Sequence, residues 1–486
     1  MKMKMRRISA LVVILLFVFE GLVLAGAKLS SVRFHSGREH DRVVFELNQM
    51  PKYKVRLNTE GDALIVDLAD VSASGLKRAS FHGKRIESVK YSLKQDHVVV
   101  TLKLMPDMGY KVQELKNPDR VFVDVLPKSL ADGKKEKQGK DEEKPRELKT
   151  GIPGMYAEEI APGLIKKAYT YWDADGQVTA YFLEADKDKY TVKPALARGQ
   201  VPGRETVLGI AKRYGAEAAV NASYFAASGD ILGITRIDNM VAGTTYFKRS
   251  AFGLHSDGKP EFGKIEYDGH VKLGDVTMPV WGVDCERGEN SLIIYNSAYG
   301  KSTRTNEFGE EYIIRNGKVA AIDTDGNAGI PSDGYVVSVH GSSQEAFKGL
   351  RVGDPASLSE DMGAKWADCP QILGVGPRLL TGGRVNVTAS EEEFPSDIRV
   401  GRAPRSAIGV TKTGNFLLGV VDGRQAESHG LTLTEWAGLM KKMGAVDAIN
   451  FDGGGSSELV IKGEIQNSPS DGTERPVGTA LIVVKK

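Results

Sequence analysis

The sequence predicts a multidomain protein in which a small N-terminal β-sandwich precedes a larger mixed α/β (α+β) domain with an internal pseudo-repeat. Three observations carry this prediction. Residues 28–127 alternate apolar and polar side chains as strands do, without helical periodicity. Residues 128–150 are rich in Lys and Glu and nearly free of apolar side chains. From residue 151 onwards, a helix–glycine–strand pattern occurs twice, and the length of 486 residues accommodates two to four domains.

The first 27 residues have the features of a secretory signal peptide. A basic start precedes an apolar core at residues 10–19, and residues 25–27 form a small-residue cleavage motif. We expect a mature chain that begins at Lys28 and works outside the cytoplasm, in the periplasm, the cell wall or the extracellular space. An uncleaved anchor is the alternative, although the core is short for a membrane span. No later segment reads as a transmembrane span.

Residues 28–127 contain an internal repeat of strands. Residues 41–47 are echoed by residues 96–102, and residues 65–68 by residues 122–125. Two half-units of this kind predict a small β-sandwich. The segment resembles the AMIN domain, and this resemblance implies a targeting module that binds peptidoglycan or another envelope glycan.

Residues 128–150 form the predicted linker. Their charge and their lack of apolar side chains exclude a packed core. Either an extended chain or a single charged helix would serve as a spacer. The large domain is therefore expected to occupy residues 151–486.

The large domain contains the pseudo-repeat. Residues 212–221 match residues 441–450 at a constant offset of 229, and both copies end in asparagine, at Asn221 and Asn450. Because helix, glycine and strand often follow one another in proteins, a chance match is the alternative. The shared length and the shared asparagine favour a real repeat, with the functional site between its halves.

Both copies carry signals for where their helix ends. An amphipathic helix precedes each copy, and Gly215 and Gly444 occupy positions where a glycine ends a helix. Thr432 and Glu435 have the spacing of a capping box at the start of the second helix. Each copy is thus predicted to run from helix to glycine to a short strand.

The second copy leads into the most informative stretch of the chain. A short apolar run ends at Asp452, and three glycines and two serines follow it: Gly453, Gly454, Gly455, Ser456 and Ser457. Glycines cost backbone entropy, but they let backbone N–H groups approach an anion closely. A carboxylate, a glycine segment and two hydroxyls at one strand end predict a site for an anionic sugar or a phosphate. A flexible hairpin turn is the alternative.

Several motifs, taken together and in this order, resemble the phosphodiester glycosidase family. They are residues 221–225, 376–377, 402–409, 422–424, 450–457 and 474–477. The resemblance extends from about residue 155 to the C-terminus. It implies a mixed α/β domain that hydrolyses a sugar C1–O–phosphate bond, and it leaves the sugar undefined. Ala222 and Ser223 stand where the family often has glycines, and Phe451 stands where it usually has leucine.

The chemistry of this bond assigns roles within the motifs. Phosphate is a good leaving group, so holding its developing charge matters more than protonating it. Arginine forks suit phosphate oxygens, which makes Arg405, Arg424 and Arg475 the candidates, with the glycine–serine segment as a further donor. A carboxylate must activate water or stabilise the cationic sugar, and Asp452 is the first choice and Asp422 the second.

The remaining predicted site residues would bind the sugar. Asn221 and Asn450 are expected to orient sugar hydroxyls or an acetamido group. The family motifs add Tyr224 and Glu474 to the predicted substrate-binding residues. For any single arginine the alternative is a surface ion pair, and for Asp422 it is an ordinary turn.

Other function classes stay open at this stage. A non-catalytic envelope protein could bind a glycan with a relic of the enzyme fold, although all the polar motifs are retained. A cell-wall amidase would need zinc ligands, and no convincing His/Glu set is present in the large domain. The net charge of +2 does not suggest a nucleic-acid partner. No cofactor is identified, a divalent cation is left open, and Cys285 and Cys369 could form a disulfide or stay free.

We expect limited proteolysis of the full chain to cut first between Lys128 and Thr150, because a segment without apolar side chains cannot pack. Two fragments should accumulate, one rich in strands and one that retains any activity of the large domain. Gel electrophoresis with N-terminal sequencing of the fragments checks this. A first cut within residues 28–127 or 151–486 would contradict the proposed boundary.

Overall fold

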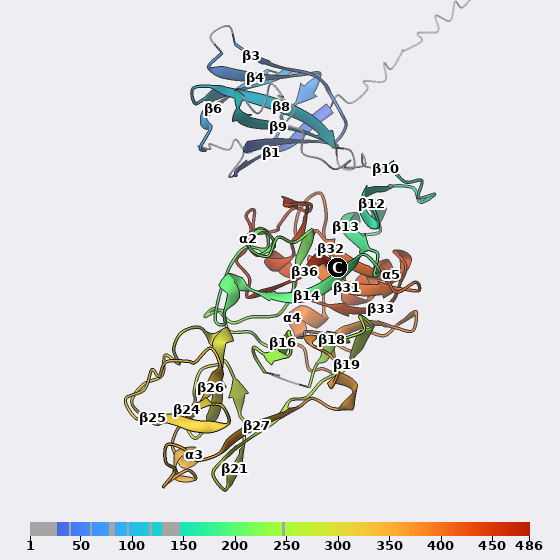
Figure 1. Cartoon of the computed structure of the whole chain (residues 1–486). Coiled ribbons are helices and arrows are strands. Elements are labelled where there is room, and N and C mark those ends of the chain that lie inside the picture. Colours follow the sequence, from blue (N-terminus) through green and yellow to red (C-terminus); the bar gives the residue numbers. More distant parts are fainter. Residues whose placement is uncertain are drawn as a thin grey trace, which may run out of the picture. The chain divides into compact units, whose positions relative to one another are not determined.

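The computed structural model describes residues 27–37, 40–58, 61–76, 83–94, 97–115, 119–128, 146–244 and 248–486 (Figure 1). The chain divides into two compact units, Met1–Gly139 and Lys140–Lys486. Residues 1–26 of the predicted signal peptide and residues 129–145 of the predicted linker lie outside the described residues. Within the described residues, no helix is long and apolar enough to cross a membrane.

The N-terminal unit consists of two β-sheets around one apolar core. A five-stranded sheet has the order β5-β1-β2-β9-β8, and a four-stranded sheet has the order β3-β4-β7-β6. Valine and leucine side chains from both sheets fill the core. The strands are β1 (Ala27–Ser36), β2 (Asp41–Leu47), β3 (Lys52–Leu57), β4 (Ala63–Ala69), β5 (Val71–Ser72), β6 (Ile86–Lys94), β7 (His97–Leu104), β8 (Met108–Leu115) and β9 (Asp119–Pro127).

The sequence repeat of this unit is visible in its strand pairing. β2 of the first copy pairs with β9 of the second, and β7 of the second copy pairs with β4 of the first. Each sheet therefore contains one strand of each copy, which ties the two halves into one core. The resemblance of this unit to the AMIN domain stays a prediction.

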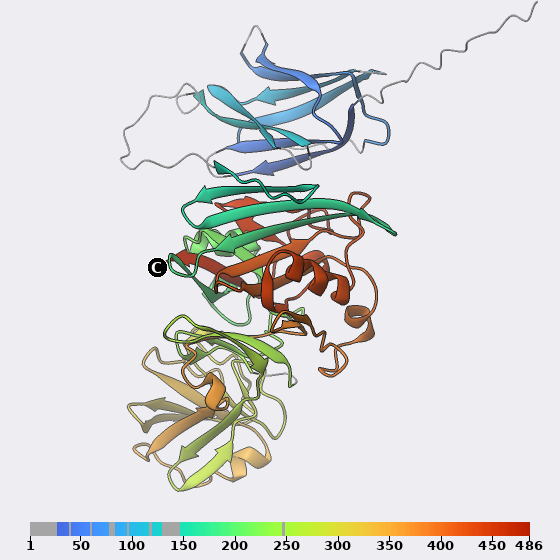
Figure 2. The ribbon, with the colours of Figure 1, turned by 90° about the vertical axis from the view of Figure 1, so that its right-hand side faces the viewer.

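Two antiparallel sheets form the body of the large unit. The main sheet has the order β10-β11-β12-β13-β32-β31-β33-β29-β30, and the second sheet has the order β14-β36-β15-β34-β35. In Figure 2 the main sheet runs from the teal strands of residues 155–185 to the orange strands near the C-terminal end. The strands are β10 (Arg146–Glu147), β11 (Met155–Ala161), β12 (Leu164–Asp173), β13 (Gly176–Ala185), β14 (Tyr190–Leu196), β15 (Ala218–Asn221), β29 (Arg378–Thr381), β30 (Arg384–Val385), β31 (Arg405–Thr411), β32 (Phe416–Val421), β33 (Ala445–Asn450), β34 (Leu459–Ile461), β35 (Glu464–Ile465) and β36 (Thr479–Lys485).

The prediction of a mixed α/β domain was wrong, because the large unit is built mainly from strands. Its helices are α2 (Val207–Arg213), α3 (Ser342–Glu345), α4 (Ser396–Arg399) and α5 (Leu433–Lys442), with short 3₁₀ turns between some strands. The helix–glycine–strand pattern occurs once in each of the two sheets. The other strands of these sheets pair antiparallel and need no helical crossover.

The two predicted helices cover the outer faces of the two sheets. α5 packs on the main sheet, where Trp436 stacks on Phe182 of β13 with ring centroids 5.9 Å apart. α2 packs on the second sheet over the core that contains Val460 and Ile482. The capping box of Thr432 is confirmed. The glycines that end the helices, at residues 215 and 444, have φ angles of +60° and +107°, which favour glycine.

One buried side chain joins the two sheets. Asn221, the last residue of β15, is 0% exposed. Its Nδ2 donates to the backbone carbonyl of Asp452 at 2.7 Å. Its Oδ1 accepts from Ser406 Oγ in β31 at 2.7 Å and from the Glu458 N–H at 3.1 Å. The amide therefore links the end of β15 to the main sheet and to both ends of the loop between β33 and β34.

An insertion between the two copies of the pseudo-repeat adds three small sheets. Their orders are β17-β16-β28-β18-β19, β21-β20-β27 and β22-β23-β26-β24-β25. The strands are β16 (Thr235–Ile237), β17 (Met240–Val241), β18 (Ser250–Leu254), β19 (Pro260–Lys264), β20 (Asp268–Leu273), β21 (Val276–Pro279), β22 (Gly282–Val283), β23 (Leu292–Tyr295), β24 (Glu310–Arg315), β25 (Lys318–Asp323), β26 (Gly334–Val339), β27 (Ala356–Asp361) and β28 (Gln371–Gly374).

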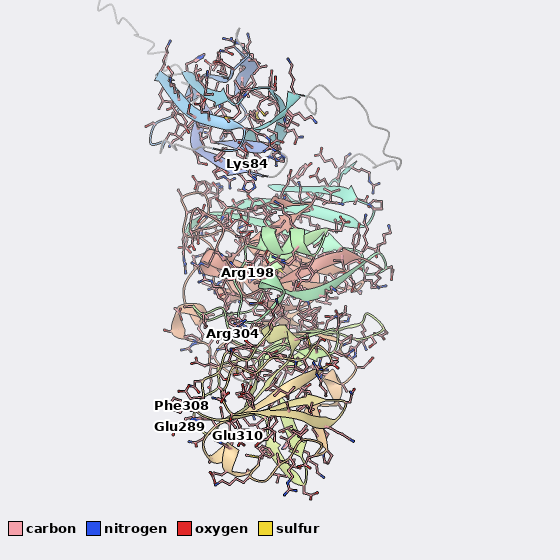
Figure 3. All side chains as sticks on the ribbon, turned by 60° about the vertical axis from the view of Figure 1, so that its left-hand side comes forward. Lys84, Arg198, Glu289, Arg304, Phe308 and Glu310 are labelled. Atoms are coloured by element: carbon pink, nitrogen blue, oxygen red, sulfur yellow. The ribbon has the colours of Figure 1, made fainter. Side chains whose placement is uncertain are left out.

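The insertion contacts the segment that precedes α2. The Val201 N–H donates to the Ala298 carbonyl at 2.7 Å. Arg198 and Arg304, from the two segments that meet here, are labelled in Figure 3. The question that the sequence left open about the cysteines is answered within the insertion, since Cys285 and Cys369 are free thiols.

We expect Asn221→Ala to lower the free energy of unfolding of the large unit by about 2–4 kcal/mol, because it leaves the buried Glu458 N–H and Ser406 hydroxyl without their acceptor. Urea denaturation followed by tryptophan fluorescence measures this. The matched control is Asn386→Ala at an exposed position, which should change stability by less than about 0.5 kcal/mol. Equal effects of the two changes would refute the linking role of Asn221.

Candidate active site

Asp452 is the residue around which the candidate site is built. It follows β33, and its N–H donates to the Ala222 carbonyl at 2.9 Å. Its Oδ1 accepts from the Gly453 N–H at 2.9 Å. Burial raises the pKa of Asp452 to about 6, although the Ser456 hydroxyl, the Gly453 N–H and the charge of Arg475 act in the opposite direction. Such a carboxyl is mostly ionised at neutral pH and can still accept a proton, as a general base must.

The glycine segment after Asp452 gives room to two guanidinium groups. Gly454 has a φ of +62°, and a Cβ there would lie 3.2 Å from Nη1 of Arg424. A Cβ on Gly455 would lie 2.1 Å from Nη2 of Arg475, which is impossible without displacing that arginine. The glycines are therefore required for the approach of two cations to this backbone, in agreement with a site for an anion.

The two arginines differ in what they already bind. Arg475 forms an ion pair with Asp471 at 2.6 Å. Arg424 is exposed, has a φ of +59°, and within the described residues its guanidinium forms no hydrogen bond or ion pair. An exposed cation without a protein partner can bind an incoming anion without first breaking an internal bond.

Arg405 lies deeper and is already bonded to the protein. It is 3% exposed, and its Nε, Nη1 and Nη2 donate to the carbonyls of Leu431, Ile398 and Gly401 at 3.0–3.2 Å. Burial, and then the charge of Arg424, lower the pKa of Arg405 despite the opposing effect of Tyr224. The structure thus places Arg405 as the group that holds the loop around residues 398–401.

Asp422, the second predicted carboxylate, is bonded to a neighbouring loop. Its Oδ1 accepts from Asn467 Nδ2 at 3.1 Å and from the Ser468 N–H at 3.0 Å. Asn467 also donates to the Ser457 carbonyl at 2.9 Å. Asp422 therefore positions the glycine–serine segment through Asn467, a buried residue that the sequence analysis missed because it stands in an unremarkable loop.

The second asparagine of the pseudo-repeat is only partly bonded. Asn450 Nδ2 donates to the Phe451 carbonyl at 2.5 Å and to Tyr224 OH at 3.3 Å. The Tyr224 hydroxyl donates to the Gly376 carbonyl at 3.1 Å. Burial, and then the negative charge of Asp452, raise the pKa of Tyr224, so it stays a neutral donor. Asn450 Oδ1 is buried and has no partner in the protein.

Further buried polar atoms also have no hydrogen-bond partner within the described residues. They include Ser223 Oγ, Ser457 Oγ, Glu458 Oε1, Ser470 Oγ and Glu474 Oε1. Buried polar atoms are normally hydrogen-bonded, since leaving one unpaired costs about 1–3 kcal/mol. Ser457 and Glu458 belong to the loop that begins at Asp452, so a hydroxyl-rich ligand bound at this loop would supply missing bonds.

Glu458 and Glu474 form a carboxyl pair that the sequence analysis did not foresee. Glu458 is 1% exposed and lies in hydrogen-bond contact with Glu474. Burial, and then the negative charge of Glu474, raise the pKa of Glu458 to about 9. The sequence offered one signal for this contact. Glu458 directly precedes the apolar run of β34, and a glutamate is rarely buried there without a specific partner.

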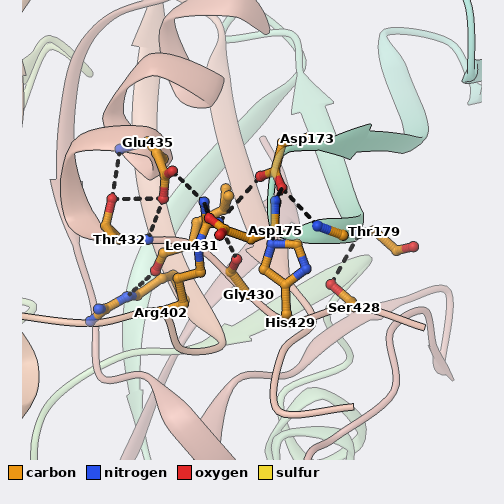
Figure 4. Close-up of polar contacts among 12 residues, drawn as sticks. Asp173, Asp175, Thr179, Arg402, Ser428, His429, Gly430, Leu431, Thr432 and Glu435 are labelled. Carbon is orange, nitrogen blue, oxygen red and sulfur yellow. Dashed lines mark hydrogen bonds and ion pairs between the residues drawn. The ribbon is translucent and has the colours of Figure 1, made fainter. Parts of the chain in front are cut away.

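The motif around Arg402 has a supporting role near this site (Figure 4). Arg402 donates to Asp175 and Glu435 at 2.6 Å each, and to Asp173 at 3.3 Å. His429 also contacts Asp173, with 3.3 Å between Nε2 and Oδ1. All these groups are paired with one another, so this cluster fixes the start of α5 and the loop before it.

Within the described residues, no group of three or more His, Cys, Asp or Glu side chains is arranged to hold a metal ion. The side chains that the site offers for chemistry are its carboxyl groups, its arginines and its hydroxyls. A carboxylate base, a buried carboxyl with a raised pKa at Glu458, and an exposed guanidinium at Arg424 suit hydrolysis of a bond to an anionic group.

Comparison with known proteins points to the same chemistry. Residues 308–484 match the phosphodiester glycosidase family. This segment contains the predicted site residues from Arg405 to Glu474 and Arg475, whereas Asn221 and Tyr224 precede it. A mouse N-acetylglucosamine-1-phosphodiester alpha-N-acetylglucosaminidase is 31% identical over 157 residues, which cover 29% of this chain and 30% of that protein. The matched segments span no more than 30% of the length of the curated relatives.

Two solved structures share the fold over nearly the whole chain. A hypothetical protein from Synechocystis has a TM-score of 0.64 at 22% identity, covering 95% of this chain and 81% of the other. A Burkholderia pseudomallei protein described by name as exported has a TM-score of 0.56 at 17% identity, covering 94% of this chain and 99% of the other. At these identities the likeness concerns the fold alone.

We expect the stability of the protein to depend on pH through Asp452. Because folding raises the pKa of Asp452 from 3.8 to about 6, its contribution to stability is complete below about pH 4 and is lost as the pH rises through 6. Asp452→Asn, which cannot ionise, should therefore gain on the order of 2 kcal/mol over the wild type between pH 4 and pH 8.

Calorimetric unfolding at pH 4, 6 and 8 measures this difference. Asp325→Asn, at an exposed position, is the matched control and should follow the wild type at all three pH values. A difference between Asp452→Asn and the wild type that stays constant across the range would show that Asp452 is not a perturbed carboxyl.

Proposed function

We propose that this protein hydrolyses a glycosyl phosphodiester, in which the C1 oxygen of a sugar is bonded to phosphate, in a glycan or polymer of the cell envelope. The observation that carries the proposal is the exposed guanidinium of Arg424, which has no hydrogen bond or ion pair with the described residues and lies next to Gly454, two residues after Asp452. Arginine binds phosphate oxygens with paired hydrogen bonds. The match of residues 308–484 to the phosphodiester glycosidases supports the same reaction.

In this proposal, phosphate binds between Arg424 and Arg475. Arg475 would exchange its ion pair with Asp471 for the phosphate, and the N–H groups of the glycine segment would add donors. Arg405 is already bonded to three carbonyls. It would therefore hold the surrounding loop in place and add its positive charge to the site. We therefore assign phosphate binding to Arg424 and Arg475, and a positioning role to Arg405.

The carboxylate of Asp452 would activate water. Asp452 accepts a proton from the water molecule that attacks C1, while the electron pair of the C1–O bond leaves with the phosphate. The products are a free sugar and a phosphomonoester. Sugar hydroxyls would satisfy the orphaned hydroxyl of Ser457 and the Oδ1 atom of Asn450.

We propose that this reaction takes place outside the cytoplasm. The signal-peptide pattern of residues 1–27 supports export, and one protein of similar fold is described as exported. The AMIN-like unit would bind peptidoglycan or another envelope glycan and so hold the hydrolase near its substrate. A non-catalytic glycan-binding protein is the second candidate, because the orphaned hydroxyls would equally bind a sugar that is not cleaved.

A panel of sugar-1-phosphodiesters, including the methyl phosphodiester of N-acetylglucosamine, tests the proposal with the purified full chain. Asp452→Asn should lower kcat/KM by about 10²-fold or more. Arg424→Lys and Arg475→Lys keep the charge but lose the planar fork, and each should lower kcat/KM on phosphodiesters by about 10-fold or more. The same arginine variants should lose less on a sugar with a neutral aryl leaving group.

Arg351→Lys, at an exposed position of the insertion, is the matched control and should leave the rates unchanged. Binding of the panel sugars without hydrolysis by the wild type would favour the glycan-binding function. Equal losses on phosphodiester and aryl substrates would mean that the arginines shape the site without holding the phosphate.

A further inference from the structure

A carboxylate of the protein itself lies on the glycine segment. Arg475 holds Asp471 with two bonds to the same carboxylate oxygen, from Nε at 2.7 Å and from Nη2 at 2.6 Å. A Cβ on Gly455 would overlap both carboxylate oxygens of Asp471 as well as Nη2 of Arg475. The ion pair therefore lies directly against the backbone of Gly455, in space that only a glycine leaves open.

This carboxylate takes the position that an anionic ligand would use. The preceding residue, Gly454, gives the same room to the guanidinium of Arg424. Two arginines thus reach consecutive residues of the glycine segment, and Asp471 is the anion bound to one of them. A carboxylate and a phosphodiester both carry a single negative charge, and both accept paired hydrogen bonds from a guanidinium. The side chain of Asp471 therefore resembles the phosphate group of a substrate in charge and in hydrogen bonding.

The segment that carries Asp471 is weakly attached to the rest of the unit. Asp471 is exposed. Within the described residues, the one backbone–backbone hydrogen bond of residues 470–475 is a local turn, in which the Gly472 N–H donates to the Pro469 carbonyl at 3.0 Å. The ion pair with Arg475 is local as well, because its partners are four residues apart. Opening this ion pair therefore breaks no backbone hydrogen bond to either sheet.

The ion pair is also weak enough for a ligand to replace it. The side chains of Asp471 and Arg475 are 37% and 36% exposed. At such exposure water screens the attraction, and an ion pair changes an equilibrium by only about 2- to 5-fold. Within the described residues Asp471 pairs with Arg475 alone. A phosphate that binds Arg424 as well as Arg475 gains a second cation, so it is the stronger competitor.

We propose that Asp471 is a specificity-determining residue. Its carboxylate occupies the anion position on Gly455 while no substrate is bound, and a ligand enters when its phosphate replaces that carboxylate on Arg475. This inference rests on the proposed phosphate site between Arg424 and Arg475. A neutral group cannot take the place of the carboxylate, so Asp471 selects ligands that carry an anionic group at this position.

Binding of inorganic phosphate to the purified full chain at neutral pH, measured by isothermal titration calorimetry, tests the inference. Asp471→Asn keeps the size of the side chain and removes its charge, so it should tighten phosphate binding by about 2- to 5-fold. Glu345→Gln is the matched control, because it removes one partner of an exposed ion pair with Lys348 in the insertion. It should leave the phosphate affinity unchanged.

A second substitution tests whether the effect arises at Gly455. The φ angle of Gly455 lies outside the left-handed region, so the backbone accepts alanine there. The added Cβ of Gly455→Ala would push the side chains of Asp471 and Arg475 off the segment. In this background Asp471→Asn should no longer tighten phosphate binding, because the carboxylate has already left the position for which it competes.

Kinetics give a readout that a merely structural role would not change. On the methyl phosphodiester of N-acetylglucosamine, Asp471→Asn should lower KM by about 2- to 5-fold, and this change should exceed any change in kcat. On a sugar with a neutral aryl leaving group KM should stay the same, because no phosphate replaces Asp471 there.

The outcomes separate this inference from the proposed function. Phosphate affinity of Asp471→Asn that is equal to or weaker than that of the wild type overturns the role of Asp471, and so does an undiminished gain in the Gly455→Ala background. If the wild type still hydrolyses phosphodiesters, the proposed function stands. Tighter phosphate binding by Asp471→Asn without hydrolysis of any phosphodiester overturns the proposed reaction and leaves Asp471 as the competing anion of a phosphate site.

Discussion

The amide of Asn221 is the interaction on which the rest of the site depends. It binds the carbonyl of Asp452 at one end of the glycine segment and the N–H of Glu458 at the other, and it also accepts from Ser406 of the main sheet. One buried side chain thus fixes both ends of a loop whose glycines would otherwise have many conformations. Preorganised groups of this kind lower the cost of holding charge during a reaction.

Burial raises the pKa values of the two carboxyl groups on this loop by different amounts. Asp452 has a backbone N–H, a hydroxyl and the charge of Arg475 to stabilise its ionised form, so burial raises its pKa only to about 6. Glu458 faces another carboxylate, and its pKa rises to about 9. Local partners, and not burial alone, decide which carboxyl keeps its proton.

The pseudo-repeat shows how two similar sequence segments can make different contacts in the folded protein. Both copies fold as helix, glycine and strand, and both end in a buried asparagine. Asn221 is bonded at both ends of its amide because it lies between two sheets. Asn450 Oδ1 is buried and has no hydrogen-bond partner among the described residues. The difference arises from the neighbouring strands and not from the repeat itself.

The sequence by itself determined the local features: the two helices with their glycine ends, the capping box of Thr432, and the chain segment that carries Asp452 and the glycines. These depend on residues close in sequence, whose conformational preferences act before any tertiary contact forms. Only the tertiary structure decided that antiparallel sheets dominate the large unit, that Arg405 is bonded to carbonyls while Arg424 stays unpaired, and that Glu458 meets Glu474. Strand pairing and burial join residues far apart in the chain, so no local pattern encodes which polar groups will find a partner and which will be left for a ligand.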